Sequence, residues 1–226
     1  MKKLTRALAI AVASLTLASA AMAAPETLDI DVVHSIVGFQ VRHFFAKTPG
    51  RFKDFTGKVA FDAKNPAASS VDVTIQATSI DTENDRRDNH LRSGDFFEVE
   101  KFPTLTFKST KVELAPGKKE LTAGDAFKIQ GDLTIKGITK PVTLDATYVG
   151  SGTVGIGGNS MGTVSGFEAT TKVNRKDFNI LWNRTLDQGG TMLGDDVTIN
   201  LQVEAKTPRP APPAAAPAAA PAGDKK

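Results

Sequence analysis

The sequence predicts an all-β protein, an eight-stranded antiparallel up-and-down barrel with one short helix. Three observations predict it: apolar and polar residues alternate in eight segments, turn-forming residues separate these segments, and one polar segment has the features of a helix. Alternation with a period of two places one face of each strand in the core and the other in water. Because a meander of antiparallel strands leaves two exposed edges, we expect the sheet to close.

The eight predicted strands follow one another along the central part of the chain. Lys136-Gly137 separates two of them and is typical of a tight hairpin turn, and Asn65-Pro66 and Pro116-Gly117 mark further loops. The strand signals lie at 37–41, 55–61, 71–77, 105–107, 127–135, 142–148, 167–173 and 197–203.

The segment 82–93, TENDRRDNHLRS, departs from the alternation and predicts the short helix. Thr82 stands three residues before Asp85 as a candidate cap, and Gly94 is a candidate stop. The segment is polar nearly all round, so we expect the helix on the surface or the barrel rim and not in the core.

The two ends of the chain predict a three-part organisation. Lys2, Lys3 and Arg6 precede an alanine-rich apolar run and the triplet 21–23, Ala-Met-Ala, which together are typical of a signal peptide over 1–23. Residues 207–226 are nearly all Pro and Ala and are expected to form a disordered tail. The barrel therefore occupies 24–206, a length sufficient for one core, and is expected to be exported and soluble in the periplasm.

Charge and cysteine content exclude several classes of protein. The chain carries 28 Lys and Arg against 25 Asp and Glu, but residues 24–206 alone hold 22 basic and 24 acidic residues. Without a basic excess on the domain, nucleic-acid binding is not expected. The chain contains no cysteine, so neither a disulfide nor a cysteine-linked lipid anchor can form.

Three short motif matches lack the context that their chemistry needs. Residues 150–155 match a dinucleotide-binding loop and 158–162 match a nucleophile elbow, but further glycines and a strand follow instead of a helix. We interpret the glycine-rich stretch as a loop. The acidic alternation at 81–85 lacks the glycine and the bidentate acid of a calcium loop, where Arg86 and Arg92 stand. The sequence therefore predicts neither an enzyme nor a metal site.

The alternation alone leaves the content of the barrel open. An eight-stranded barrel has room either for its own side chains or for one slender ligand. His43 ends the inward row of the first strand, where it could face a ligand or serve as a structural histidine.

The chain resembles the YceI family of periplasmic, lipocalin-like barrels over about residues 27–206. No single stretch carries the resemblance; the order and spacing of many short stretches do. They are Asp31, His34 and Ser35; Gly50-Arg51-Phe52; Ile80-Asp81-Thr82; His90 to Ser93; Asp95-Phe96-Phe97; Phe102-Pro103; Gly131 to Ile135; Lys140 to Leu144; and Arg175 with Asp177-Phe178.

The resemblance implies a central pore that holds a polyisoprenoid or a similar amphiphile such as a quinone, and no other cofactor. The inward rows and nearby aromatic residues are expected to line this lumen: Val37, Phe39, Val41, His43, Phe44, Phe45, Phe55, Val59, Phe61, Val73, Ile75, Ala77, Phe96, Phe97, Phe102, Leu105, Phe107, Ile129, Leu133, Ile135, Val142, Leu144, Phe167, Phe178, Trp182, Ile199 and Leu201.

The polar head of such a lipid is expected at a mouth near the helix. Arg87, His90 and Arg92 are the candidate contacts for a phosphate head group, and the alternative is that they are solvated helix charges. The alternatives are a structural or stress-related interaction module with a filled barrel, and a carrier of fatty-acid amides. Transient membrane contact and a homodimer are further possibilities.

Overall fold

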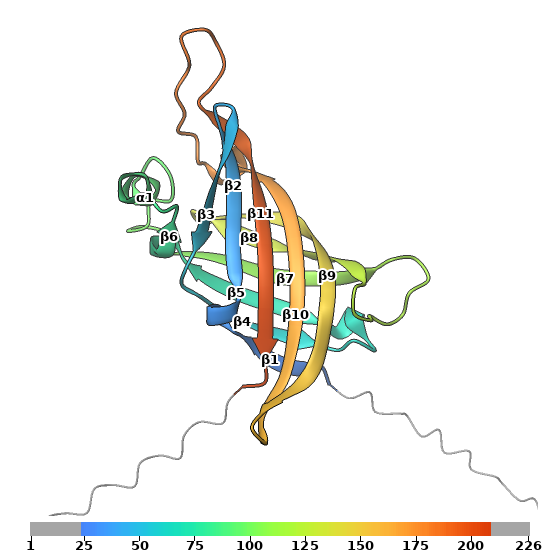
Figure 1. Cartoon of the computed structure of the whole chain (residues 1–226). Coiled ribbons are helices and arrows are strands. Elements are labelled where there is room, and N and C mark those ends of the chain that lie inside the picture. The colour runs from blue at the N-terminus through green and yellow to red at the C-terminus, as the bar shows by residue number, and fades with distance from the viewer. Residues whose placement is uncertain (1–23, 209–226) are drawn as a thin grey trace, which may run out of the picture.

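The structure, a computed structural model, describes residues 24–208. The predicted signal peptide and nearly all of the predicted tail lie outside the described residues. Figure 1 shows a barrel of antiparallel strands with one α-helix, α1 (Asp85–Arg92), beside it. The strands are β1 (Glu26–Ile30), β2 (Ile36–His43), β3 (Ala46–Phe52), β4 (Phe55–Phe61), β5 (Ser70–Gln76), β6 (Ile80–Asp81), β7 (Thr104–Leu114), β8 (Ala126–Ile135), β9 (Ile138–Ile156), β10 (Asn159–Asn174) and β11 (Leu193–Lys206).

The wall of the barrel consists of eight long strands, three of which are interrupted. A 3-10 turn at Val32–His34 separates β1 from β2, two residues separate β3 from β4, and a 3-10 turn at Ala77–Ser79 separates β5 from β6. The two halves of each strand pair with the same neighbours: β1 with β4 and β2 with β3, then β4 with β5 and β3 with β6.

Strand β11 closes the barrel because it pairs antiparallel with both β1 and β2. The remaining strands follow in chain order from β5 through β7, β8, β9 and β10 to β11. The prediction of an eight-stranded antiparallel up-and-down barrel with one short helix is confirmed.

The turn between β8 and β9 has the predicted form. Lys136 and Gly137 both have positive φ, at 50° and 72°, and Ile135 pairs with Ile138 across them. Two positive φ values in a two-residue hairpin loop match the twist of the flanking strands.

The glycine-rich stretch 150–162 is not the predicted loop. Strands β9 and β10 continue through it as a paired hairpin, with Gly157 and Gly158 alone forming the turn. Figure 1 shows this hairpin extending beyond the barrel wall, at the end opposite the β2–β3 turn. Glycine weakens a strand but does not prevent pairing when a long neighbouring strand offers the ladder.

The helix is shorter than predicted, and its cap is Asn84, whose side chain accepts a hydrogen bond from Arg87 N at 3.0 Å. The predicted cap, Thr82, is instead buried, and its hydroxyl lies 2.5 Å from the Asp88 carboxylate. Helix α1 contacts β6 at the rim, as its polar composition predicts. Among the helices of residues 24–208, none has the length and apolar character needed to cross a membrane.

Candidate functional site

An apolar cavity of about 980 Å³ occupies the interior of the barrel. The barrel is therefore not filled by its own side chains, and the alternative of a packed core is wrong. Aliphatic and aromatic side chains from β2, β4, β5 and β7 through β11 line most of it. All but four of the predicted lumen residues lie on its wall.

The four exceptions lie where the strand alternation stops. Phe44 and Phe45 form the β2–β3 turn; Phe45 is fully exposed, and the Phe44 ring packs on His43 with centroids 4.3 Å apart. Ala77 is buried in a 3-10 turn, and Phe102 lies against Gly137. A period of two orients side chains only within a strand, so it fails at turns.

Aromatic residues close the cavity at the end where β9 and β10 extend. Phe61 lies between Tyr148 and Phe167, with ring centroids 4.9 and 5.0 Å away. Leu121 covers the same cluster from the β7–β8 loop, which its backbone N–H fixes by donating to Ala63 O at 2.8 Å. The lumen therefore ends on an apolar floor.

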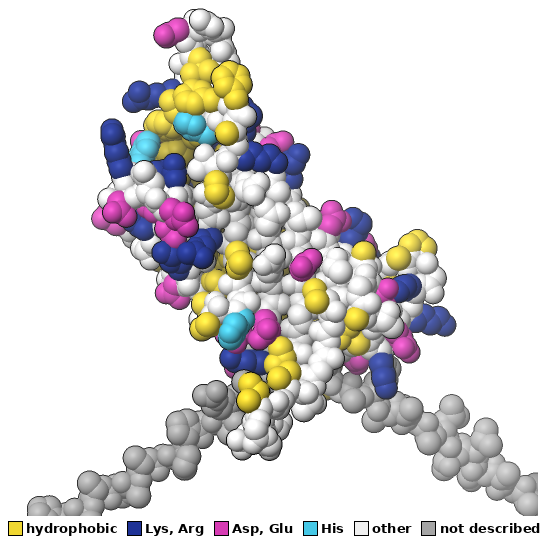
Figure 2. All heavy atoms as spheres, viewed as in Figure 1, with side chains coloured by type: hydrophobic (Ala, Val, Ile, Leu, Met, Phe, Trp, Pro, Cys, Tyr) yellow, Lys and Arg dark blue, Asp and Glu magenta, His cyan; other side chains and the backbone are white. Residues whose placement is uncertain are grey.

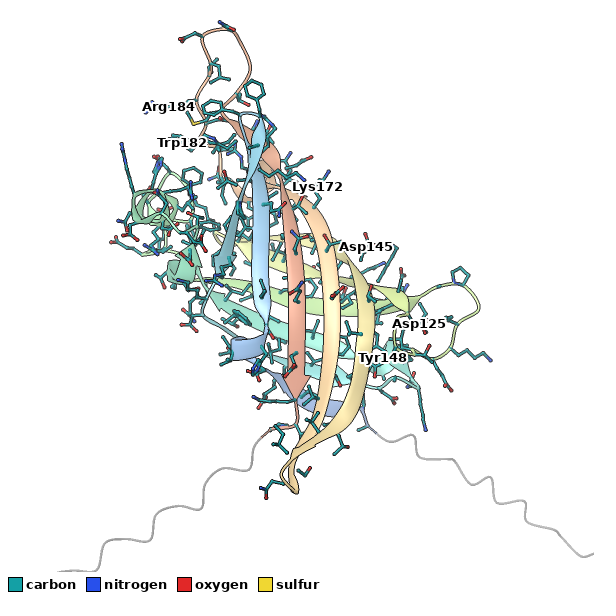
Figure 3. The ribbon with its side chains drawn as sticks, in the orientation of Figure 1. Asp125, Asp145, Tyr148, Lys172, Trp182 and Arg184 are labelled. Carbon is teal, nitrogen blue, oxygen red and sulfur yellow. The ribbon has the colours of Figure 1, made fainter. Side chains whose placement is uncertain are left out.

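The cavity reaches solvent at the opposite end, between α1, the β2–β3 turn and the segment 182–192. Trp182 lies on this mouth, with its ring centroid 4.9 Å from that of His90 and 5.3 Å from that of Phe96. Figure 3 shows Trp182 and Arg184 beside the β2–β3 turn, far from Tyr148. Because these aromatic contacts join α1 to the segment before β11, they define one side of the opening.

Arginines surround the mouth, and three exposed ones line it: Arg86, Arg87 and Arg184. Arg87 is oriented by Thr82, to which its Nε and Nη2 donate hydrogen bonds of 2.7 Å each. Arg175 also reaches the cavity, but its guanidinium is buried and donates to three backbone carbonyls and to Asp195. Burial of the guanidinium lowers the pKa of Arg175, and the neighbouring Asp195 carboxylate opposes this shift.

Only two of the three predicted head-group residues lie on the mouth. Arg87 and His90 line the cavity, and His90 Nε2 is 2.7 Å from the Asp95 carboxylate. Arg92 does not line it, because its side chain donates to Thr78 O and Ile80 O and so fixes α1 to the wall. Successive helical residues differ by about 100°, so Arg92 cannot share the face of His90 two residues before it.

Sequence reasoning missed two of the mouth arginines. Arg86 could have been found, since it lies four residues before His90 and therefore on the same helical face. Arg184 had no such signal, because the segment 182–192 shows neither the period of a strand nor that of a helix. The segment is held at the mouth by a hydrogen bond of 2.9 Å that Phe44 N donates to Met192 O. His43 lines the mouth from the last position of β2, which leaves both of its predicted roles open.

Known sequences and structures resemble this chain over most of its length. The profile of the YceI-like domain family matches residues 28–205. Protein YceI from Escherichia coli O6:H1 is 46% identical over 164 residues, which are 72% of this chain and 80% of that protein. A UPF0312 protein of Enterobacter sp. (strain 638) is 43% identical over 204 residues, which are 89% and 97% of the two chains.

Solved structures share the fold. BcnA from Burkholderia cenocepacia superposes with a TM-score of 0.63 at 25% identity, over 78% of this chain and 99% of that one. The Campylobacter jejuni YCEI protein superposes with a TM-score of 0.60 at 32% identity, over 74% of this chain and 90% of that one. A polyisoprenoid binding domain from Saccharophagus degradans superposes with a TM-score of 0.57 at 16% identity, over 81% of this chain and 99% of that one. At this identity the comparison shows likeness of fold alone.

Proposed function

The chain belongs to the YceI-like family, and we propose that it is a periplasmic, non-enzymatic carrier of a long isoprenoid-type lipid. The lipid is a polyprenyl phosphate or an isoprenoid quinone. Its tail lies in the lumen, and its head lies at the mouth beside α1.

The observation that carries this proposal is the cavity itself. A volume of about 980 Å³ lies at the upper end of the range for ligand pockets, ~300–1,000 Å³. Its apolar wall runs from the Phe61 floor to the Trp182 mouth, so the shape suits one long apolar chain with a polar group at one end. A relative described as binding polyisoprenoids has the same fold, which supports this class of ligand.

Selectivity must come from the head group and the shape of the tail. Burial of each CH₂ from water contributes ~0.8 kcal/mol, but in a cell the tail is transferred from a membrane in which it is already out of water. The total apolar area therefore discriminates little. The cations Arg86, Arg87 and Arg184 favour a phosphate, because guanidinium groups bind phosphate oxygens with paired donors.

The direct test is mass spectrometry of the organic extract from protein that is exported and purified without detergent. We expect one long-chain isoprenoid per barrel, and its mass identifies the head group. A fatty-acid amide at the same stoichiometry would support the alternative ligand. Normally folded protein with no lipid would favour an interaction module.

A pair of tryptophan substitutions tests the location of the lipid. Ala169 lines the cavity from β10, whereas Lys172, on the same strand, is exposed (Figure 3). We expect Ala169→Trp to abolish co-purification of the lipid by filling the lumen, and Lys172→Trp to retain it. Equal lipid content in both variants, each with native circular dichroism, would place the lipid outside the barrel.

A further inference from the structure

The rim of the mouth carries an exposed apolar surface, which we call the docking rim and define by Phe45, Leu181, Arg42, Lys47 and Arg184. Phe45 is fully exposed and Leu181 is 58% exposed. The β2–β3 turn, which carries Phe45, lies beside Met192 and Arg184, because Phe44 N donates to Met192 O and Met192 N donates to Arg184 O, each at 2.9 Å. Leu181 lies three residues before Arg184 in the same segment. Figure 2 shows hydrophobic side chains gathered at this end of the molecule with basic groups around them.

The aromatic turn is unfavourable for the isolated protein in two ways. Phe44 has φ of 49°, a left-handed conformation that a bulky side chain rarely adopts. Phe45 exposes its entire side chain to water. Asn or Gly would satisfy this turn without either cost, so the two adjacent phenylalanines require a reason other than the stability of the free barrel.

The charge of the hairpin complements an anionic surface. From Ile36 to Phe52 it contains Arg42, Lys47 and Arg51 and not one Asp or Glu. Asp187 is the acidic residue of the adjacent segment 181–192, which also carries Arg184. Exposed apolar side chains flanked by cations are the combination with which a protein surface enters the headgroup region of a bilayer.

We propose that the docking rim binds the surface of a bilayer that contains anionic lipids, with Phe45 and Leu181 inserted among the headgroups. This inference rests on the proposed carrier function, because it places the mouth against the membrane from which a lipid would enter. His43, Trp182 and Arg184 line the cavity on the inner side of this rim, so a lipid head would pass from the bilayer to the mouth arginines directly.

The charges argue against a second copy of the chain as the occupant. A two-fold symmetric interface brings the same surface of each copy together. Such a dimer would gather Arg42 and Lys47 of both copies in one interface, to which the β2–β3 hairpin contributes no acid. An anionic bilayer supplies the opposite charge.

The test is co-sedimentation of the folded protein with vesicles of phosphatidylcholine alone and of phosphatidylcholine with phosphatidylglycerol. We expect binding to the anionic vesicles that weakens at high salt. Phe45→Ser should weaken it about tenfold or more, since a Phe side chain no longer leaves water. Phe45 does not line the cavity, so this variant should keep its lipid content.

Ile156→Ser provides the matched control. Ile156 is 70% exposed at the tip of the β9–β10 hairpin, at the opposite end of the barrel, so its loss should leave vesicle binding unchanged. Equal binding by wild type and Phe45→Ser, or a dimer in sedimentation velocity that Phe45→Ser dissociates without any vesicle binding, overturns the proposal. Lipid recovered from the lumen in either case would leave the carrier function standing.

Discussion

Asp31 lies next to the junction at which β11 pairs with β1 and closes the barrel. Its buried carboxylate lies 2.6 Å from Lys206 Nζ and 2.9 Å from His34 Nδ1, and it accepts a hydrogen bond from Val33 N. These contacts join the β1–β2 interruption to the end of β11. Glu204 lies nearby, but Lys206 already supplies the positive charge that a metal ion would bring to this group. The cluster is therefore structural.

Asp31→Asn is expected to lower the free energy of unfolding at neutral pH by ~2 kcal/mol, because Lys206 and His34 lose a charged acceptor. Urea denaturation measures this change. Asp72→Asn, at an exposed position of β5, is the control and should have little effect. Equal stability of the two variants would show that the junction between the β1–β2 turn and the end of β11 does not depend on this carboxylate.

Hydrogen bonds from Lys206 and then His34 lower the pKa of Asp31 from 3.8 to about 2. The carboxylate therefore contributes stability above pH 3.8, and this contribution is lost as the pH falls from 3.8 toward 2. The hydrogen bond to Asp31 raises the pKa of His34 from its ordinary value of 6.5. While Asp31 is ionised, the contribution of His34 is therefore complete below pH 6.5 and is lost as the pH rises through the elevated pKa. Asp31→Asn should flatten the acid limb of the stability profile, which chemical denaturation between pH 2 and 5 would record.

At the scale of elements, the contact between β7 and β8 shows how the wall makes room for large lumen side chains. The ladder shifts register between Ser109 and Lys111, opposite Gly131 of β8. A Cβ atom at Gly131 would lie 2.5 Å from the Phe107 ring and 2.7 Å from the Lys108 carbonyl oxygen. The missing side chain therefore leaves the space in which Phe107 packs.

Gly131→Ala should destabilise the barrel by ~1–3 kcal/mol, because the added methyl group must displace the Phe107 ring and a backbone oxygen. Gly152→Ala is the matched control: it lies in β9, where an added Cβ would meet nothing within 4 Å. That substitution should be neutral or slightly stabilising, because alanine restricts the unfolded chain. Thermal denaturation of both variants decides this, and equal melting temperatures would contradict the packing argument.

At the scale of the whole molecule, the apolar core of the barrel surrounds the cavity, and the same side chains form both. Phe107, Leu133 and Leu144 belong to the main apolar cluster and also line the cavity, so one side of each faces the lumen. Side chains that line a void lose the dispersion contacts of a packed interior. A lipid tail would supply these contacts, and the proposed ligand would therefore act as part of the core.

Removal of the lipid should lower the melting temperature, and restoring it should reverse the change. A ligand present at 100 times its Kd stabilises the folded state by ~2.7 kcal/mol. For a domain of this size that corresponds to about 5–10 °C. Differential scanning calorimetry of extracted and reloaded protein measures the shift, and Ala169→Trp should show none. An unchanged melting temperature on reloading wild type would contradict a lumen site.

The alternation of apolar and polar residues is enough to predict the strand count, the order of the strands and most of the cavity wall. A period of two fixes which side chains share a face, so Phe39, Ile75 and Leu133 could be assigned to one interior from local pattern alone. The turn at Lys136-Gly137 was equally predictable, because its geometry depends only on the two residues in it and the strands they join.

The arrangement of residues at the ends of the barrel and the space inside it depend on contacts that form only when the strands assemble. Whether inward rows enclose a void depends on the diameter that eight paired strands impose, which no single strand encodes. The positions of Phe45, Arg92 and Arg184 depend on contacts between segments far apart in the chain, where the alternation has ended. Local periodicity thus specifies the wall, whereas the arginines of the mouth come together only when the closed wall brings distant segments side by side.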